Sequence, residues 1–295
     1  MENTEKCPGS ESQEQEALQI DEFTNDLIVS LQGEDKDIRR KLLSSLLGSL
    51  EKLKPLLFVD SPDNIICKLT DPQDLVRASK RIDGFVKDWI QSFRSNGCFY
   101  DVGSNVGTFG IYAAKTCGPD LSIYAFEFHY PTFATLCANI LANDVAESVV
   151  PVHLALGKDS GVGTSYYRSL NSGSALHQLD SAVDFKGDLF EPDSRIQTCR
   201  ASVDTLCGTW GFHPPDYIKI DTDGNEYDVI LGARETFSRA KSMEVLVEFV
   251  HHSDAANRFE NIVRVLKDCG FSLTERLPHK RIANLPVEDL FFTKR

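Results

Sequence analysis

The stretch that most constrains the fold of this chain is FYDVGSNVGTFG, at residues 99–110. A short apolar run ends at Asp101, and Gly103, Asn105 and Gly107 follow before a helical pattern begins. Glycines at such a turn permit positive φ angles and let a ligand approach the backbone closely. The helix N-terminus behind them adds N–H groups that have no partner within the helix. The pattern therefore predicts a ligand-binding turn between a buried strand and a helix.

The same stretch lacks two common phosphate-binding motifs. Counted from Gly103, the dinucleotide motif Gly-x-Gly-x-x-Gly would need glycines where Asn105 and Thr108 stand. A P-loop would need a Gly-Lys-Ser/Thr ending, which this stretch does not have. A carboxylate before the turn suits a ligand with an ammonium group better than a pyrophosphate. An NAD-linked enzyme is therefore disfavoured.

Glu127 gives the second indication of the ligand. It ends the next strand, in YAFEF, where an acidic side chain can accept both ribose hydroxyls. Taken alone, it is explained equally well as a solvated carboxylate at a strand end. Together with the turn, it predicts a cofactor with an amino-acid end and a ribosyl-adenine end, a description that fits S-adenosyl-L-methionine.

Strand-like and helix-like patterns alternate after residue 97, as is typical of a parallel sheet with crossover helices. Residues 157–200 interrupt this alternation with a polar, Gly- and Ser-rich insertion, which we expect to be partly β and too long for a simple connection. The predicted strands are 98–102, 121–127, 148–156, 216–221, 243–249, 271–277 and 289–295.

Two further regions precede this alternation. Residues 1–16 have almost nothing to bury, so they are predicted to form a disordered tail. Residues 17–96 are predicted to be a helical extension without recognisable chemistry, whose amphipathic faces pack or form a homodimer contact. Its helices are expected at 20–31, from 37 to Pro55, and from Pro72 through Phe93.

The composition narrows the class of protein. A net charge of −13 disfavours attraction to polyphosphate, and no Lys/Arg cluster with interleaved aromatic residues indicates a nucleic-acid partner. Eight scattered cysteines without a Cys-x-x-Cys pair fit reduced core thiols better than a disulfide or zinc framework. There is no apolar leader and no run of membrane-spanning length. We therefore expect a cytoplasmic protein with no membrane span.

Four segments resemble the FkbM family of methyltransferases in order and spacing: FYDVGSNVGTFGIYAAK, IYAFEFHYPTFATLCANILAN, VVPVHLALG and DYIKIDTDGNEYDVILGA. The segment KIDTDGNE is similar to the family pattern Lys-Ile-Asp-Val-Glu-Gly-x-Glu, with Thr222 and Asp223 as departures, and Phe128 replaces the first proline of Phe-Glu-Pro-x-Pro. The resemblance implies that residues 97–295 form an FkbM-like α/β domain of the class I (Rossmann-like) methyltransferase fold. Such a domain has a seven-stranded, mostly parallel sheet with helices on both faces.

The turn, the strand ends and the resemblance together assign the cofactor contacts. Asp221 is expected to help position the cofactor, because it ends the fourth strand. The predicted cofactor-binding residues are Asp101, Gly103, Ser104, Asn105, Gly107, Glu127, Phe128, Ala155, Leu156 and Asp221. The segment NSGSALHQL, residues 171–179, is either part of this site or a polar surface loop.

The catalytic group is predicted from the same strand ends. Methyl transfer to a hydroxyl needs a base, and the candidates are Asp221, His251 and His252. Alternatively, Asp221 and Glu248 hold a divalent metal that acidifies the hydroxyl, an interpretation that we favour less than a metal-free histidine base. Asp223 and Glu226 also fit acidic residues that complement a helix dipole.

These observations favour an S-adenosylmethionine-dependent O-methyltransferase, because the resemblance implies transfer to a hydroxyl of a small molecule or saccharide. The alternative is a catalytically silent relative of the fold that acts as a binding or scaffold protein through its N-terminal helices. The presence of Asp101, Glu127 and Asp221 favours the enzyme, since a silent relative has no need of all three.

Overall fold

The structure is a computed structural model that describes residues 36–53, 58–184, 186–251, 255–282 and 285–295. Contacts divide the chain into two compact units, Met1–Leu57 and Phe58–Arg295. In the first unit, helix α2 (Lys36–Leu53) corresponds to the helix expected from residue 37 to Pro55. The tail predicted at 1–16 and the helix predicted at 20–31 lie outside the described residues.

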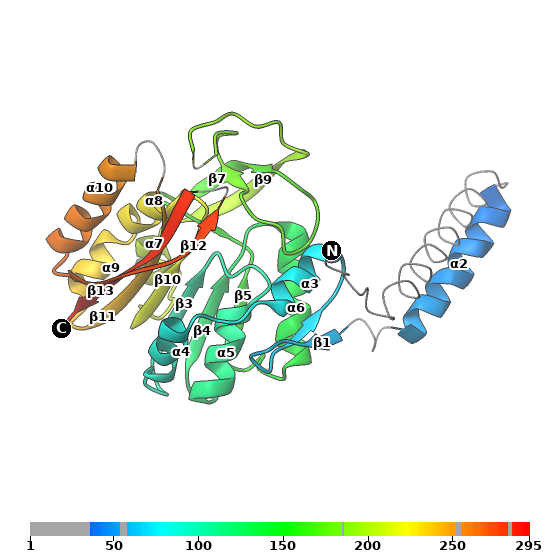
Figure 1. The fold of residues 1–295 in the computed structure, drawn as a ribbon, viewed down its shortest axis with the longest axis horizontal. Coiled ribbons are helices and arrows are strands. Elements are labelled where there is room, and N and C mark those ends of the chain that lie inside the picture. The colour runs from blue at the N-terminus through cyan, green and yellow to red at the C-terminus, as the bar shows by residue number, and fades with distance from the viewer. Residues whose placement is uncertain (1–35, 54–57, 185, 252–254, 283–284) are drawn as a thin grey trace, which may run out of the picture. The chain divides into compact units, whose positions relative to one another are not determined.

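The second unit is built on a seven-stranded sheet in the order β12-β13-β11-β10-β3-β4-β5 (Figure 1). Strands β11, β10, β3, β4 and β5 are parallel, whereas β13 is antiparallel to both β11 and β12. All seven predicted strands are present, and the sheet is mostly parallel as expected. The bounds are β3 Cys98–Val102, β4 Ser122–Phe126, β5 Val149–Val152, β10 Tyr217–Ile220, β11 Met243–Val250, β12 Ser272–Ile282 and β13 Leu285–Lys294.

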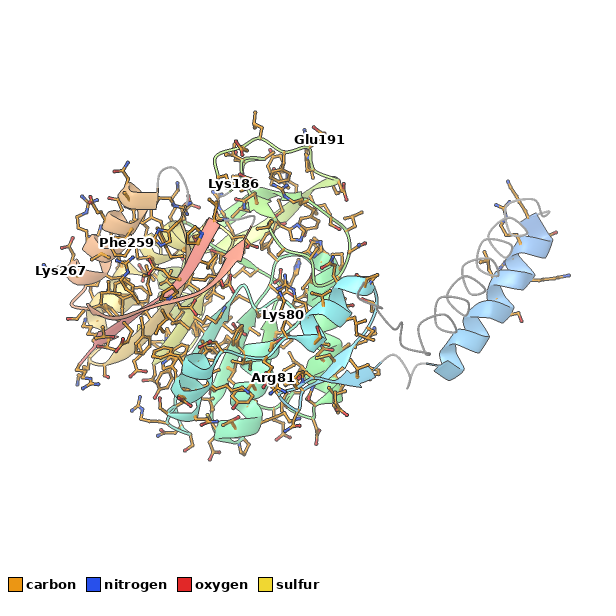
Figure 2. All side chains as sticks on the ribbon, viewed as in Figure 1. Lys80, Arg81, Lys186, Glu191, Phe259 and Lys267 are labelled. Atoms are coloured by element: carbon orange, nitrogen blue, oxygen red, sulfur yellow. The ribbon has the colours of Figure 1, made fainter. Side chains whose placement is uncertain are left out.

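Helices cover both faces of this sheet, and side chains fill the space between the layers (Figure 2). Tyr100 and Phe99 belong to separate buried clusters, because successive side chains of a strand point to opposite faces. The cluster around Phe99 includes α5 and α6, and the cluster around Tyr100 includes α7 to α10. The bounds are α5 Thr108–Cys117, α6 Tyr130–Ala142, α7 Val203–Gly208, α8 Glu226–Leu231, α9 Arg234–Arg239 and α10 Ala255–Asp268.

Residues 58–96 pack on the same sheet, so the compact unit begins at Phe58 and the boundary predicted at residue 97 falls inside it. A two-stranded antiparallel sheet of β1 (Phe58–Asp60) and β2 (Ile66–Lys68) precedes helices α3 (Pro72–Ser79) and α4 (Gly84–Gln91). The prediction of a single helix from Pro72 through Phe93 is wrong, because two helices form in this segment. Asp71 and Asp83 each accept from the backbone N–H two residues later, and these two N-caps start separate helices.

The insertion forms a second sheet beyond the carboxyl ends of the parallel strands (Figure 1). Its order is β6-β9-β7-β8, in which β6 comes from the end of the strand predicted at 148–156. Strands β7, β8 and β9 confirm the expectation that the insertion is partly β. Residues 168–177 connect β7 to β8 and are called the β7–β8 loop below. The bounds are β6 Ala155–Leu156, β7 Gly161–Tyr167, β8 Gln178–Leu179 and β9 Ser194–Ala201.

Two sequence-based expectations concern the chain as a whole. Within the described ranges, no helix is both long enough and apolar enough to cross a bilayer. The cysteines in these ranges are all free thiols.

Trp89 joins the segment 58–96 to the sheet. Its ring meets Phe93, Phe99 and Phe291 edge-on, at centroid distances of 4.9, 6.0 and 5.7 Å. Its indole N–H donates to Oε2 of Glu244 at 2.8 Å. Helix α4 is therefore part of the hydrophobic core of this unit.

We expect Trp89→Ala to lower the free energy of unfolding by about 3–5 kcal/mol, because it removes a buried aromatic ring and leaves a cavity. Trp210 is 51% exposed, so Trp210→Ala should change the stability by less than about 0.5 kcal/mol. Urea denaturation followed by circular dichroism measures both. Equal losses in the two variants would show that α4 does not contribute to this core.

Candidate functional site

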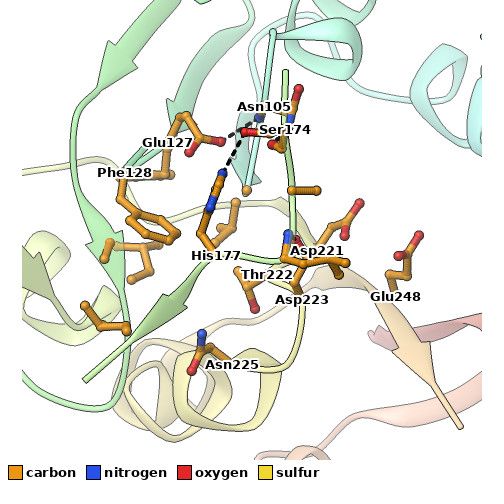
Figure 3. Close-up of a pocket in the computed structure, with 18 of the residues that line it drawn as sticks. Asn105, Glu127, Phe128, Ser174, His177, Asp221, Thr222, Asp223, Asn225 and Glu248 are labelled. Atoms are coloured by element: carbon orange, nitrogen blue, oxygen red, sulfur yellow. Dashed lines mark hydrogen bonds between the residues drawn. The ribbon is translucent and has the colours of Figure 1, made fainter. Parts of the chain in front are cut away.

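A cavity of about 320 Å³ lies at the carboxyl ends of the parallel strands, beside the β7–β8 loop (Figure 3). Glu127 and Phe128 lie on one side of it, and Asp221 and Glu248 on the other. Of the residues predicted from the sequence, the cavity brings together Gly103, Asn105, Glu127, Phe128, Ala155, Leu156, Asp221 and Glu248. It does not include Asp101, Ser104, Gly107 or His251. His252 lies outside the described residues.

The glycine turn is fixed by contacts within the protein. Gly103 has a φ of 75°, and a Cβ placed there would lie 1.8 Å from the carbonyl oxygen of Asp221. Gly107 caps α5 with a φ of 92°, and its Cβ would lie 2.5 Å from Leu136. These glycines thus let the turn pack against the end of β10 and against α6. Only Gly103 also lines the cavity.

Glu127 is buried at the cavity wall, and both of its carboxylate oxygens accept backbone N–H groups. Oε2 accepts from Asn105 at 2.9 Å, and Oε1 accepts from His129 at 2.8 Å. Burial raises the pKa of Glu127 to about 7, although these two N–H groups oppose the shift. The carboxylate therefore holds the end of β4 against the turn after β3 and is costly to ionise in the free protein.

Asp101 lies beneath the turn, fully buried and away from the cavity. Its Oδ2 accepts from the N–H of Gly110 at 3.1 Å and so attaches α5 to β3. Its Oδ1 has no hydrogen-bond partner within the described part of the chain. Burial raises the pKa of Asp101 to about 6, and the positive charge of Lys219 opposes that shift.

Lys219 is the main residue of this region that sequence reasoning missed. It is 4% exposed in β10, where it pairs in register with Asp101 of β3. Its ammonium donates to Oδ2 of Asp221 at 2.8 Å. Burial lowers the pKa of Lys219, but Asp221, Asp101 and Glu248 raise it above the usual value, so the lysine stays charged. A lysine inside an apolar strand is rare, and this feature of the sequence could have identified Lys219 as a site residue.

Asp221 and Glu248 come together as the sequence predicted. Strands β10 and β11 are neighbours, and Ile220 pairs with Val247. The residues that follow this pair, Asp221 and Glu248, therefore stand side by side at the same edge of the sheet. Both carboxylates line the cavity. The described residues include no group of three or more His, Cys, Asp or Glu side chains arranged to hold a metal ion.

His251 lies outside the cavity wall and is bonded to another group. Its Nε2 is 2.7 Å from Oε1 of Glu288. Arg276 donates to both oxygens of the same glutamate, from Nε at 2.9 Å and from Nη2 at 2.6 Å. The negative charge of Glu288 that faces His251 is therefore shared with an arginine, and His251 does not line the cavity.

The β7–β8 loop supplies one wall of the cavity, through Ser174, Ala175, Leu176 and His177. The amide of Asn105 donates to the carbonyl of Ser174 at 3.0 Å. The N–H of Leu176 donates to Oδ2 of Asp223 at 2.7 Å. The segment 171–179 is thus in contact with both turns at the strand ends.

His177 was not singled out from the sequence, yet it is a neutral wall residue. Its Nδ1 accepts the N–H of Arg168 at 3.1 Å, so its Nε2 carries the proton and faces Oγ of Ser174 at 3.0 Å. Burial lowers the pKa of His177 to about 3. This histidine is a hydrogen-bonding residue at neutral pH and not a base.

Asp223 and Glu226 follow Asp221 in the turn after β10. Asp223 lines the cavity with a φ of 53°, and burial raises its pKa to about 6. Oε1 of Glu226 accepts the N–H groups of Gly224 and Thr222 at 2.8 and 3.2 Å. Glu226 therefore stabilises the turn, while Asp223 faces the site.

Comparison with known proteins gives one family match. A family model described as a methyltransferase FkbM domain matches residues 101–273. No curated protein matches the chain in sequence.

Several solved structures are similar at low identity. The methyltransferase FkbM from Methylobacillus flagellatus KT is 14% identical with a TM-score of 0.46, over 67% of this chain and 44% of that one. This chain thus spans less than half the length of that protein. A precorrin-6y C5,15-methyltransferase from Geobacter metallireducens GS-15 is 14% identical with a TM-score of 0.42, over 72% and 87% of the two chains. A putative rRNA methylase from Clostridium thermocellum is 11% identical with a TM-score of 0.45, over 73% and 99%.

Because Gly103 lies so close to the carbonyl of Asp221, we expect that one methyl group added at this position strongly destabilises the fold. Gly103→Ala should lower the free energy of unfolding by at least about 2 kcal/mol more than Gly118→Ala. Gly118 also has a positive φ of 92°, but a Cβ there would meet nothing within 4 Å, so only backbone strain remains. Urea denaturation compares the two variants. A similar loss in both would show that the turn does not approach β10 this closely.

Proposed function

This chain belongs to the FkbM family of methyltransferases, and from that premise we propose that it is an S-adenosylmethionine-dependent O-methyltransferase acting on a hydroxyl of a small molecule or saccharide. The observation that carries the proposal is the buried Glu127 carboxylate at the end of β4, on the wall of a cavity at the strand ends. Ligands of open α/β sheets bind at this edge, and an acidic residue in this position accepts ribose hydroxyls.

The residues present fit the proposed cofactor. Glu127 would hold the ribose, and the apolar side chains of Phe128, Leu154 and Leu156 line the same cavity and suit a purine. Asp223 supplies negative charge that suits an ammonium group. The cavity volume, about 320 Å³, lies within the range of small-molecule sites. When bound, S-adenosylmethionine supplies a methyl group on a cationic sulfur.

We assign the base to Asp221. A general base must reach the proton that it removes, and Asp221 lines the cavity whereas His251 does not. The ammonium of Lys219 donates to Oδ2 of Asp221 at 2.8 Å, which fixes the orientation of this carboxylate at the cavity wall. The protein's other contribution is to hold the acceptor oxygen in line with the methyl group.

A methyl-transfer screen tests the proposal directly. Radiolabelled S-adenosylmethionine is incubated with hydroxylated metabolites and saccharides, and transfer of label to an oxygen is the expected result. Calorimetry with S-adenosylhomocysteine tests the cofactor separately. Absence of saturable binding at millimolar ligand would reject the enzyme and leave the silent binding or scaffold protein.

Glu127→Gln should weaken S-adenosylhomocysteine binding by about 1–2 kcal/mol, roughly ten-fold, because a charge-assisted bond to a ribose hydroxyl becomes neutral. Glu147→Gln is the matched control, since Glu147 is exposed and does not line the cavity. Calorimetry gives both dissociation constants, and thermal unfolding checks that each variant is folded. An unchanged constant for Glu127→Gln would mean that the ribose lies elsewhere.

The same carboxylate makes the binding pH-dependent. The pKa of Glu127 is raised to about 7 in the free protein, and ribose hydroxyls that donate to the ionised form lower it in the complex. Binding should therefore release a proton, and affinity should fall as the pH decreases below 7. The Glu127→Gln variant has no such proton, so its affinity should fall less steeply. Calorimetry in two buffers of different ionisation enthalpy measures the release.

Once the screen has identified an acceptor, Asp221→Asn should reduce turnover by about 10²–10⁴-fold, because the variant cannot take the hydroxyl proton. His251→Ala should change turnover only a few-fold. Turnover should survive EDTA, since the Lys219 ammonium already neutralises Asp221. A large loss in His251→Ala alone would return the base to the histidine. Loss of activity in EDTA that Mg²⁺ reverses would make Asp221 and Glu248 metal ligands.

A further inference from the structure

Helix α3 lies outside the matched residues 101–273, yet two of its side chains contact the β7–β8 loop. Nε of Arg77 donates to the carbonyl of Gly173 at 2.8 Å. Oδ1 of Asp74 accepts from Oγ of Ser172 at 2.8 Å. Arg77 also lines the cavity. A segment that precedes the family domain is therefore in direct contact with the wall of the site.

The loop backbone lies directly on α3. Gly173 has a φ of 67°, and a Cβ there would lie 3.0 Å from Oδ1 of Asp74 and 3.3 Å from Cγ of Arg77. From the other side, Oγ1 of Thr132 accepts the N–H of Gly173 at 3.0 Å. Both polar groups of the Gly173 backbone are therefore satisfied, by two different helices.

The side chain of Asp74 is held in place by several hydrogen bonds. It is 2% exposed and belongs to the capping box of α3, in which its side chain accepts the N–H of Asp71 at 3.3 Å. The N–H of Thr70 donates to the same oxygen at 2.7 Å. One buried carboxylate thus starts the helix and accepts the hydroxyl of Ser172.

The residues that follow these contacts form the cavity wall. Ser174 follows Gly173 directly, and Leu176 comes two residues after Ser174. Their backbone groups are hydrogen-bonded to Asn105 and Asp223, respectively. Arg77 therefore acts on the loop at Gly173, directly before this wall.

We propose that Arg77 is a positioning residue that holds the β7–β8 loop closed over the cavity, so that cofactor retention depends on helix α3. The link to the cofactor rests on the proposed function, whereas the effect on the loop does not. The bond from Nε to the Gly173 carbonyl is the critical contact. Its loss frees the loop at the residue just before the cavity wall.

Three substitutions separate this role from a general effect of charge. Arg77→Ala removes the donor. Arg77→Gln keeps an N–H donor at the same number of bonds from Cα as Nε, without the charge. Arg81→Ala is the matched control, because Arg81 is an exposed cation four residues later that does not line the cavity (Figure 2).

Hydrogen exchange of the free 295-residue chain tests the loop. Arg77→Ala should speed exchange several-fold in peptides covering residues 168–177, with β3 and β4 unchanged, because a hydrogen bond that holds the loop is lost. Arg77→Gln should stay within about two-fold of the unmodified protein, and Arg81→Ala should match it. Unchanged loop exchange in Arg77→Ala would overturn the proposal.

Calorimetry and stopped-flow release of S-adenosylhomocysteine test the consequence. Arg77→Ala should raise the dissociation constant about three- to ten-fold through faster release, and Arg77→Gln should restore most of the affinity. In turnover, the KM for S-adenosylmethionine should rise more than kcat falls. Faster loop exchange with unchanged affinity and release would show that the loop does not retain the cofactor, and would overturn the proposal.

Two experimental outcomes require a separate interpretation. If the unmodified protein does not bind S-adenosylhomocysteine, the proposed function fails, and the exchange of Arg77→Ala against Arg77→Gln alone decides whether Arg77 holds the loop. If Arg77→Ala does not fold, Arg77→Lys replaces it, because it keeps the charge and most of the side chain but has no N–H at the position of Nε. It should speed loop exchange in the same way, and no change would overturn the proposal.

Discussion

The rest of the site depends on the interaction between the buried ammonium of Lys219 and the carboxylates around it. The carboxyl ends of the parallel strands bring Asp101, Asp221 and Glu248 to one edge of the sheet, and all three act on the pKa of this lysine. Like charges gathered in a low-dielectric region would otherwise repel one another, and burial alone would favour their neutral forms. One internal cation on the middle strand β10 allows the acidic edge to form without a large loss of stability.

Several segments distant in sequence meet around this edge, and each contact fixes a neighbour. Glu127 joins the ends of β4 and β3, Asp223 joins the turn after β10 to the β7–β8 loop, and Asp74 joins that loop to α3. Burial raises the pKa of both Glu127 and Asp223, so part of the folding free energy opposes their ionised state. Perturbed pKa values of this kind cluster at functional sites.

The sequence predicted the parts of the site that follow from local patterns. The glycine turn, the acidic residue that ends β4, and the pair Asp221 and Glu248 were found because each stands at the end of a recognisable strand. It did not predict that Asp101 lies below the turn, that His251 binds Glu288, or the split of the helix expected from residue 72. These outcomes depend on side-chain partners that are remote in sequence or on which of two N-caps starts a helix.

The amino-acid sequence by itself determined the alternating α/β order, the seven strands and the family, because hydrophobic periodicity and short motifs act within a few residues. Only the tertiary structure decided that Gly103 must be glycine because of the Asp221 carbonyl, and that Arg77 reaches Gly173. The order of strands in a sheet sets which chain ends become neighbours, and hydrogen bonds are sensitive to tenths of an ångström. No local pattern carries that information, since the two partners are far apart along the chain and are brought together only by folding.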